Sequence, residues 1–140
     1  MAKAIVFEDL KVGDQMPPLV KEPVTLVQLV RYAGASGDFN PLHYDPAVGQ
    51  KAGFGGVIAQ GMLIMGFAGQ AISSWIPNRY LRRFKVRFLG LTRLNEVITI
   101  TGKVVEKREP DRCILCQVVA KDEKGELKLK GTFEAQLPRL

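Results

Sequence analysis

The amino-acid sequence predicts an α+β fold in which an antiparallel β-sheet wraps around one long central helix. The helix is predicted by residues 57–75, which are apolar on nearly every side and contain no Asp or Glu, so that this segment must be enclosed. The sheet is predicted by the residues from Leu81 onward, where the period of apolar residues changes from helical to alternating. Four alternating segments joined by short links are typical of an antiparallel sheet with one apolar face.

The length and composition of the chain fit one globular domain, which we assign to residues 1–140. Hydrophobic residues make up 46% of the chain and charged residues 24%, which is the ordinary balance of a globular protein. The net charge of +6 favours an anionic partner. The sequence has no basic tail and no arginine-rich helix, so a small anionic ligand explains this charge as well as a nucleic acid does.

Targeting and redox signals are weak in this sequence. Glu8 and Asp9 come before any apolar segment of useful length, so we expect no signal peptide. Residues 57–76 nearly reach membrane-spanning length, but Gln and Ser side chains interrupt them and β-type sequence follows, which favours a buried helix.

Cys113 and Cys116 lie in a predicted strand, where their spacing points them to opposite faces. We therefore expect free thiols in a reducing cytoplasm, with neither a redox pair nor, given a single histidine, a metal site.

The first half of the chain carries signals for one strand and two helices. Thr25 begins a helix because Gln28, three residues later, completes a capping-box pattern. Gly34 lies where a left-handed glycine ends a helix, and Asp45-Pro46 is an N-cap followed by proline at the first helical position. The expected elements are a short edge-like strand at residues 19–24, a helix from Thr25 to Gly34 and a short helix from Asp45 to about Ala52.

The second half of the chain is predicted to form the sheet. Turn residues at Pro110-Asp111 and at residues 122–125 separate the later strands. In the last strand Lys128 alternates with apolar neighbours, which places it on the polar face. The expected strands are residues 84–88, 97–105, 112–121 and 127–137.

Glycines inside the central helix need an explanation. Gly61, Gly66 and Gly69 each cost the helix roughly 1 kcal/mol relative to alanine. We expect the compensation to be close approach, either of the sheet or of a ligand. The first turn of this helix also offers unpaired N–H groups at the positive end of the helix dipole.

The loop of residues 34–43 is the candidate reactive segment. It holds the only histidine of the chain, His43, five positions after Asp38, in a stretch rich in Gly, Asn and Pro. A sharp bend here brings the carboxylate and the imidazole toward a common point, where they form a plausible acid–base pair around one water. The competing interpretation is an ordinary turn, in which Asp38 bonds its own backbone and His43 is a surface residue.

This loop, read as Tyr32-Ala33-Gly34-Ala35-Ser36-Gly37-Asp38-Phe39-Asn40-Pro41-Leu42-His43, closely resembles the signature of the MaoC-like dehydratases, the (R)-specific enoyl-CoA hydratases of the "hydratase 2" group. The resemblance continues through Ile58-Ala59-Gln60-Gly61-Met62-Leu63 and covers nearly the whole chain. It implies a single hot-dog fold and hydration of a trans-2-enoyl thioester to an (R)-3-hydroxyacyl thioester, or the reverse dehydration. The substrate would be carried on CoA or on an acyl-carrier protein, with no cofactor and no metal.

The resemblance also implies roles for individual residues. Asp38 would be the catalytic carboxylate and His43 its partner, so that together they activate the water added at C3. Asn40 would orient the pair, and Gly61 would offer its backbone N–H to the thioester carbonyl, where enolate charge develops. Many family members have histidine where this chain has Gln60, which reads equally as a plain buried polar residue.

Contacts farther from the reacting atoms are less specific. Met62 and Met65 are candidates for the acyl-chain lining, although core packing explains them equally well. Lys85 and Arg87 are candidates for phosphate contacts, against the alternative of a solvated strand face. The expected partners are the acyl thioester and a second subunit, because a single hot-dog unit exposes sheet edges and one side of its helix. A homodimer is expected and a heterodimer is possible, with no nucleic acid and no membrane.

Two other functions compete with hydration. Many hot-dog acyl-CoA thioesterases place an acidic residue on the central helix, and residues 55–76 have none. A non-catalytic partner subunit of a heterodimeric dehydratase has no need of both Asp38 and His43. Both observations favour a catalytic hydratase.

Overall fold

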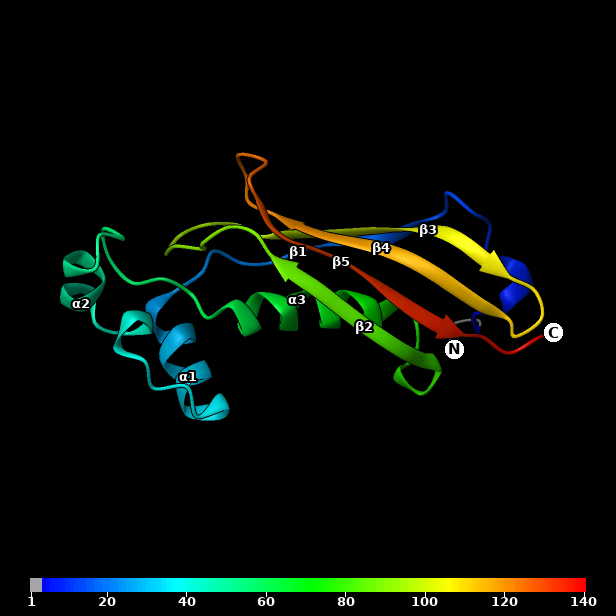
Figure 1. The fold of residues 1–140 in the computed structure, drawn as a ribbon, viewed down its shortest axis with the longest axis horizontal. Helices are drawn as coiled ribbons and strands as arrows, with labels where there is room; N and C mark the ends of the chain where they lie inside the picture. The colour runs from blue at the N-terminus through cyan, green and yellow to red at the C-terminus, as the bar shows by residue number, and fades with distance from the viewer. Residues whose placement is uncertain (1–3) are drawn as a thin grey trace.

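The computed structural model describes residues 4–140 and consists of one five-stranded antiparallel sheet that covers one side of a long helix (Figure 1). The strands lie in the order β1-β3-β4-β5-β2, which leaves β1 and β2 as the two edges. The helices and strands are β1 Gln15–Val20, α1 Leu26–Ser36, α2 Pro46–Lys51, α3 Gly61–Trp75, β2 Leu81–Phe88, β3 Thr99–Arg108, β4 Cys113–Lys121 and β5 Leu127–Gln136. Three 3-10 turns accompany them, η1 Phe7–Asp9, η2 Pro41–His43 and η3 Asn78–Tyr80.

The hydrophobic core lies between α3 and the sheet. One stripe of α3 packs on the inner sheet face, which confirms the predicted arrangement of a sheet on a central apolar helix. Trp75 at the end of α3 meets Phe133 of β5 edge to face, with ring centroids 6.4 Å apart. The buried residues of α3 are Leu63, Ile64, Phe67, Ala68, Ala71 and Ile72. In Figure 1, α1 and α2 gather at the end of the molecule where α3 begins, and both termini lie toward the opposite end.

The central helix is shorter and more exposed than the sequence predicts. It begins at Gly61 and not at residue 57, because Gln60 is an extended N-cap and Ile58 forms a β-bridge with Arg93. The prediction of enclosure on all sides is also wrong for the single chain. A stripe of α3 is exposed, and Met62 has 56% of its surface accessible.

Close approach explains only part of the glycine content of α3. A Cβ added at Gly61 would lie 3.3 Å from the ring of Phe88, which is a tight contact. At Gly69 the nearest atom, from Phe84, would be 3.7 Å away, an ordinary van der Waals distance. At Gly66 a Cβ would meet nothing within 4 Å, so the sheet does not come close there, and approach by a ligand stays a prediction.

Two boundaries in the first half differ from the prediction. The first strand, β1, starts at Gln15 and includes both prolines, which an edge strand tolerates. Helix α1 begins after the N-cap Thr25, whose side chain accepts from the Gln28 N–H, as expected. It ends at Gly37, which has a left-handed φ of 74°, and not at Gly34. Helix α2 follows its predicted N-cap, Asp45, and ends near the predicted residue.

Lys128 is buried, and the prediction that it lies on the polar sheet face is wrong. The register between β4 and β5 shifts at this point, because Ala120 pairs with Leu129 whereas Lys121 pairs with Leu127. The shift is a β-bulge with Lys128 as the extra residue. Only 1% of the Lys128 side chain is accessible.

Both cysteines are free, as the sequence predicts, and both are buried. Arg108 donates to the sulfur of Cys113 over 3.1 Å, whereas Cys116 lies in the core. Burial, together with the charge of Cys113, raises the pKa of the Cys116 thiol to about 12, so this thiol is protonated and poorly nucleophilic at neutral pH. Between residues 4 and 140, no group of three or more metal-ligating side chains is arranged to hold a metal ion. Over the same residues, no helix is long and apolar enough to cross a membrane.

Candidate active site

The loop that follows α1 is built from short side chain to backbone hydrogen bonds. Gly37 reverses the chain at the end of α1. Asp38 Oδ1 accepts from the N–H of Asn40 over 3.2 Å, and Asn40 Oδ1 accepts from the N–H of Leu42 over 3.0 Å. These two consecutive turns lead into η2, which ends at His43. The local sequence therefore fixes the position of the imidazole relative to the carboxylate.

Asp38 and His43 face each other across this loop. Asp38 Oδ2 lies 3.4 Å from His43 Nε2, with 47% of the carboxylate side chain and 12% of the imidazole side chain accessible. Asp38 takes part in both of the arrangements predicted for it. Its Oδ1 accepts from the backbone N–H of Asn40, as in an ordinary turn, and its Oδ2 faces the His43 ring, as in an acid–base pair. His43 is not a surface residue.

The other ring nitrogen of His43 fixes its tautomer. His43 Nδ1 lies 2.7 Å from the carbonyl oxygen of Ile58. A carbonyl oxygen can only accept, so Nδ1 carries the proton and donates it. In the neutral form of the ring, Nε2 is then the unprotonated nitrogen, and it faces Asp38 where it can accept a proton from a water or from a substrate.

The start of α3 is attached to the same loop. The Ile58 N–H donates to the carbonyl of Leu42 over 3.1 Å, next to the bond that Ile58 O receives from His43. Gly61 is the first residue of α3, and its N–H has no acceptor within the helix. This N–H lies at the positive end of the helix dipole, which favours developing negative charge. The buried Gln60 donates to the carbonyl of Leu29 and so ties α3 to α1.

Two contributors to this site were missed by the sequence analysis. The connection between β2 and β3, residues 89–98, contacts the segment before α3 through its backbone. The Ala59 N–H donates to Thr92 O over 2.8 Å, and Ile58 bridges Arg93. Phe88, 49% accessible, places its ring against Gly61. The alternating pattern places Phe88 on the helix side of β2, but no local sequence signal pairs Ile58 with Arg93.

The remaining predicted residues lie at different places. Met62 is exposed at the first turn of α3, and Met65 packs partly against the core. Lys85 and Arg87 are exposed on β2, where Phe88 faces α3, so the strand alternation turns both cations toward the outer sheet face. A phosphate contact from them would have to reach around the edge of the sheet, and it stays a prediction.

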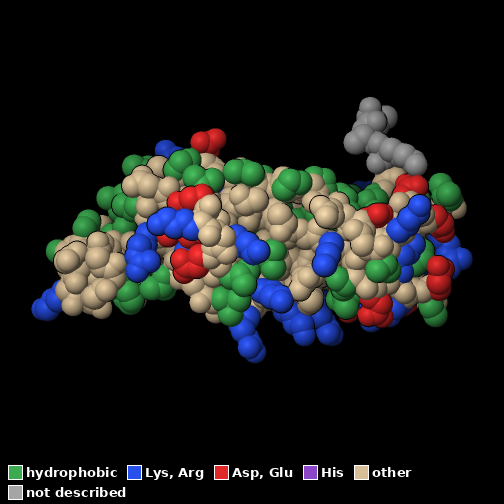
Figure 2. All heavy atoms as spheres, turned by 90° about the horizontal axis from the view of Figure 1, so that it is seen from above, with side chains coloured by type: hydrophobic (Ala, Val, Ile, Leu, Met, Phe, Trp, Pro, Cys, Tyr) green, Lys and Arg blue, Asp and Glu red, His purple; other side chains and the backbone are tan. Residues whose placement is uncertain are grey.

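The outer face of the sheet is a separate surface. Figure 2 shows this face from above, with Lys and Arg side chains along much of it. A groove of ≈ 530 Å³ on it includes Lys103, Lys121 and Lys130 in its lining. The Asp38–His43 pair is not part of this groove, and the carboxylate is the more accessible member of the pair.

Comparisons with known proteins agree with this geometry. Residues 11–125 match the family model of the MaoC like domain. The (R)-specific enoyl-CoA hydratase of Rhodospirillum rubrum is 30% identical over 139 residues, which cover 94% of this chain and 91% of that relative. Fatty acid synthase subunit beta of Gibberella zeae is 27% identical over 96% of this chain, and the chain spans only 6% of that relative's length.

A solved structure shares the whole architecture. R-hydratase PhaJ1 from Pseudomonas aeruginosa, in its unliganded form, has a TM-score of 0.87 and 24% identity, with 98% of this chain and 88% of that chain covered. This likeness confirms the hot-dog fold. Since the family match takes in the Asp38–His43 loop and all of α3, the chain belongs to the MaoC-like domain family.

Proposed function

We propose that this chain is an (R)-specific enoyl-CoA hydratase or 3-hydroxyacyl-thioester dehydratase, a hydro-lyase acting on a trans-2-enoyl thioester. The observation that carries the proposal is the pairing of Asp38 with Nε2 of His43, whose ring is attached through Ile58 to the start of α3. The membership in the MaoC-like domain family and the (R)-specific enoyl-CoA hydratase relative point to the same chemistry.

The proposed reaction needs one water and no cofactor beyond the thioester carrier. A water held between Asp38 and His43 gives up a proton to this pair while its oxygen bonds to C3 of the enoyl group. The electrons of the double bond move toward the thioester oxygen, where the N–H of Gly61 stabilises the enolate. The pair then returns the proton to C2, the enolate collapses, and the 3-hydroxyacyl thioester is complete. Dehydration follows the same steps in reverse.

Two alternatives are weaker on the structure. The thioesterase alternative relies on an acidic residue of the central helix, and α3 spans Gly61–Trp75 without one. The alternative of a non-catalytic partner subunit leaves the Asp38–His43 pair without a purpose.

We propose a homodimer as the working form. The accessible stripe of α3, the unpaired edge of β2 and the open surroundings of the site leave an acyl chain without an enclosing wall. A second copy placed against these surfaces supplies the missing wall, and in a heterodimer a related but different subunit supplies it.

We place the enzyme in the cytoplasm, where the free Cys113 and Cys116 stay reduced.

A single assay distinguishes the candidate activities. Crotonyl-CoA is incubated with the protein, and loss of the conjugated double bond is followed by absorbance while free CoA is followed with a thiol reagent. We expect the double bond to disappear without release of thiol, and chiral analysis to give the (R)-3-hydroxy product. Release of free CoA would support the thioesterase, and no change in either signal with CoA and carrier-protein substrates would contradict the hydratase.

A further inference from the structure

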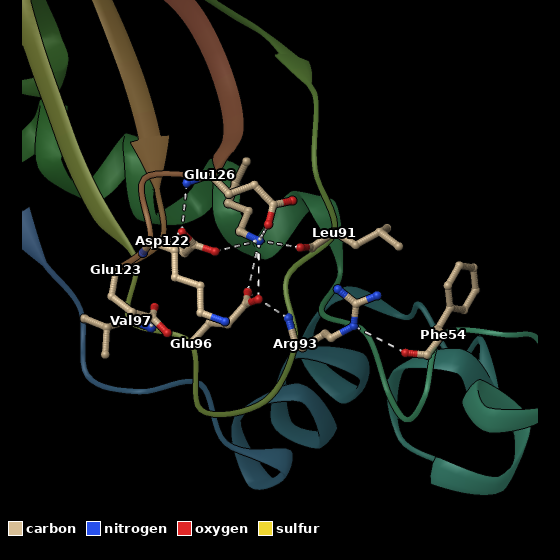
Figure 3. Close-up of polar contacts among 10 residues, drawn as sticks. Phe54, Leu91, Arg93, Glu96, Val97, Asp122, Glu123 and Glu126 are labelled. Atoms are coloured by element: carbon tan, nitrogen blue, oxygen red, sulfur yellow. Dashed lines mark hydrogen bonds and ion pairs between the residues drawn. The ribbon is translucent and has the colours of Figure 1, made fainter.

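Lys128 is a buried lysine at the centre of an ion cluster between the β4–β5 hairpin and the β2–β3 connection. Its Nζ lies 3.2 Å from Glu96 Oε2, 3.4 Å from Asp122 Oδ2 and 3.5 Å from Glu126 Oε2, and it donates to Leu91 O over 2.6 Å. Figure 3 shows Leu91, Glu96, Asp122 and Glu126 arranged around this common point. The cluster joins the hairpin between β4 and β5 to the β2–β3 connection.

The cluster is charged at neutral pH. Burial by itself lowers the pKa of Lys128, but the hydrogen bond and charge of Glu96 and the other carboxylates outweigh it and raise the pKa overall. Burial acts to raise the pKa of Asp122, and the N–H groups of Glu126 and Lys124 together with Lys128 lower it overall. A buried ammonium among carboxylates is weak evidence for stability, because apolar replacements of such groups are often neutral. A role in holding the β2–β3 connection in position explains the buried Lys128 better than a contribution to stability does.

Hydrogen bonds and one isolated β-bridge, joined by short stretches of backbone, lead from this cluster to the active site. Glu96 Oε2, held by Lys128, accepts from the Arg93 N–H over 2.9 Å. Arg93 forms the bridge with Ile58, and the neighbouring Thr92 accepts from Ala59. Ile58 O then receives the proton of His43 Nδ1 over 2.7 Å. The atom that fixes the His43 tautomer is thus held in place by the connection that Lys128 secures at both Leu91 and Glu96.

We propose that Lys128 is a positioning residue for His43. By clamping the β2–β3 connection it holds Ile58 O where Nδ1–H must donate, so that Nδ1 keeps the proton of the neutral ring and Nε2 is directed at Asp38. This inference deepens the proposed hydratase function and depends on it for its catalytic consequence. The structural part, the link between Lys128 and the His43 tautomer, is testable without any activity.

The test compares Lys128→Met with Lys130→Met, an exposed lysine on the same strand that serves as the matched control. His43 is the only histidine, so nitrogen-15 labelling of histidine gives an NMR spectrum of this one ring. We expect the unsubstituted protein and Lys130→Met to hold the proton on Nδ1, and folded Lys128→Met to show a mixture of tautomers. We also expect kcat for crotonyl-CoA to fall roughly 10- to 100-fold in Lys128→Met with KM changed little, since small misplacements of a reacting group have effects of this size.

A second variant keeps the test decisive if Lys128→Met does not fold. Glu96→Gln retains an acceptor for the Arg93 N–H but weakens the bond to Lys128, so it should change the His43 tautomer in the same direction. An unchanged Nδ1–H tautomer in whichever variant is folded would overturn the inference, whatever happens to kcat. If the unsubstituted protein does not hydrate enoyl-CoA, the proposed function fails, and the tautomer measurement still decides the role of Lys128.

Discussion

Replacing Asp38 with asparagine is expected to reduce the rate of crotonyl-CoA hydration by about 10²–10⁴-fold, the range typical of a lost acid–base group. The reason is chemical, because an amide cannot take the proton of the attacking water. The local fold should survive, since an asparagine oxygen can still accept from the Asn40 N–H as Asp38 Oδ1 does. The measurement is kcat from the loss of the conjugated double bond, with circular dichroism to verify folding.

Asp45 provides the matched control for this substitution. It lies just after the same loop, where its Oδ1 accepts from the Ala47 N–H at the start of α2. Asparagine is an equally good N-cap, so Asp45→Asn should leave stability and rate almost unchanged. A folded Asp38→Asn enzyme as active as Asp45→Asn would remove Asp38 from the chemistry.

Replacing His43 with glutamine has a comparable expected effect, also about 10²–10⁴-fold in kcat. Glutamine can still donate to Ile58 O, which preserves the anchor that the ring makes over 2.7 Å, but it presents no basic nitrogen to Asp38. The loss should therefore fall on kcat more than on KM, as measured from initial rates over a range of crotonyl-CoA concentrations.

The doubly substituted enzyme tests whether the two side chains act together. Groups that act as one unit have non-additive effects, so Asp38→Asn combined with His43→Gln should be little slower than either single variant. Multiplied losses in the double variant would instead show two independent roles. That result would contradict a single water shared between the carboxylate and the ring.

Much of the fold follows from local sequence signals. The change from helical to alternating periodicity at Leu81 predicts the sheet, and Thr25 and Asp45 predict the starts of α1 and α2, because each signal acts within a few residues. The uncharged segment after residue 57 predicts a central helix. Its outward stripe consists mostly of glycine and polar side chains, namely Gly61, Met62, Gly66, Gln70, Ser73 and Ser74. The polar residues of this stripe mark the side of the helix that faces away from the sheet.

The differences arise where tertiary contacts override local preference. Residues 57–60 have helical character, but Ile58 is extended because it pairs with Arg93, which lies far along the chain. Gly34 and Gly37 are equally suited to end α1, and the turns that begin at Asp38 select the later one. Lys128 fits an alternating strand, and only the register shift in the β4–β5 hairpin moves it inward.

The candidate site divides in the same way. Asp38, Asn40 and His43 are predictable because they lie in one short, turn-rich segment and their geometry is set locally. The Ile58 carbonyl that fixes the tautomer and the Phe88 ring beside Gly61 come from other elements, and no spacing in the sequence connects them.

The most direct test of the account is a crystal structure of the protein with (R)-3-hydroxybutyryl-CoA bound. We expect the 3-hydroxyl oxygen between Asp38 Oδ2 and His43 Nε2, and the thioester oxygen about 3 Å from the Gly61 nitrogen. A product molecule bound elsewhere, for example with its acyl group in the groove on the outer sheet face, would contradict it. So would a hydroxyl placed away from both side chains while the thioester oxygen faces solvent.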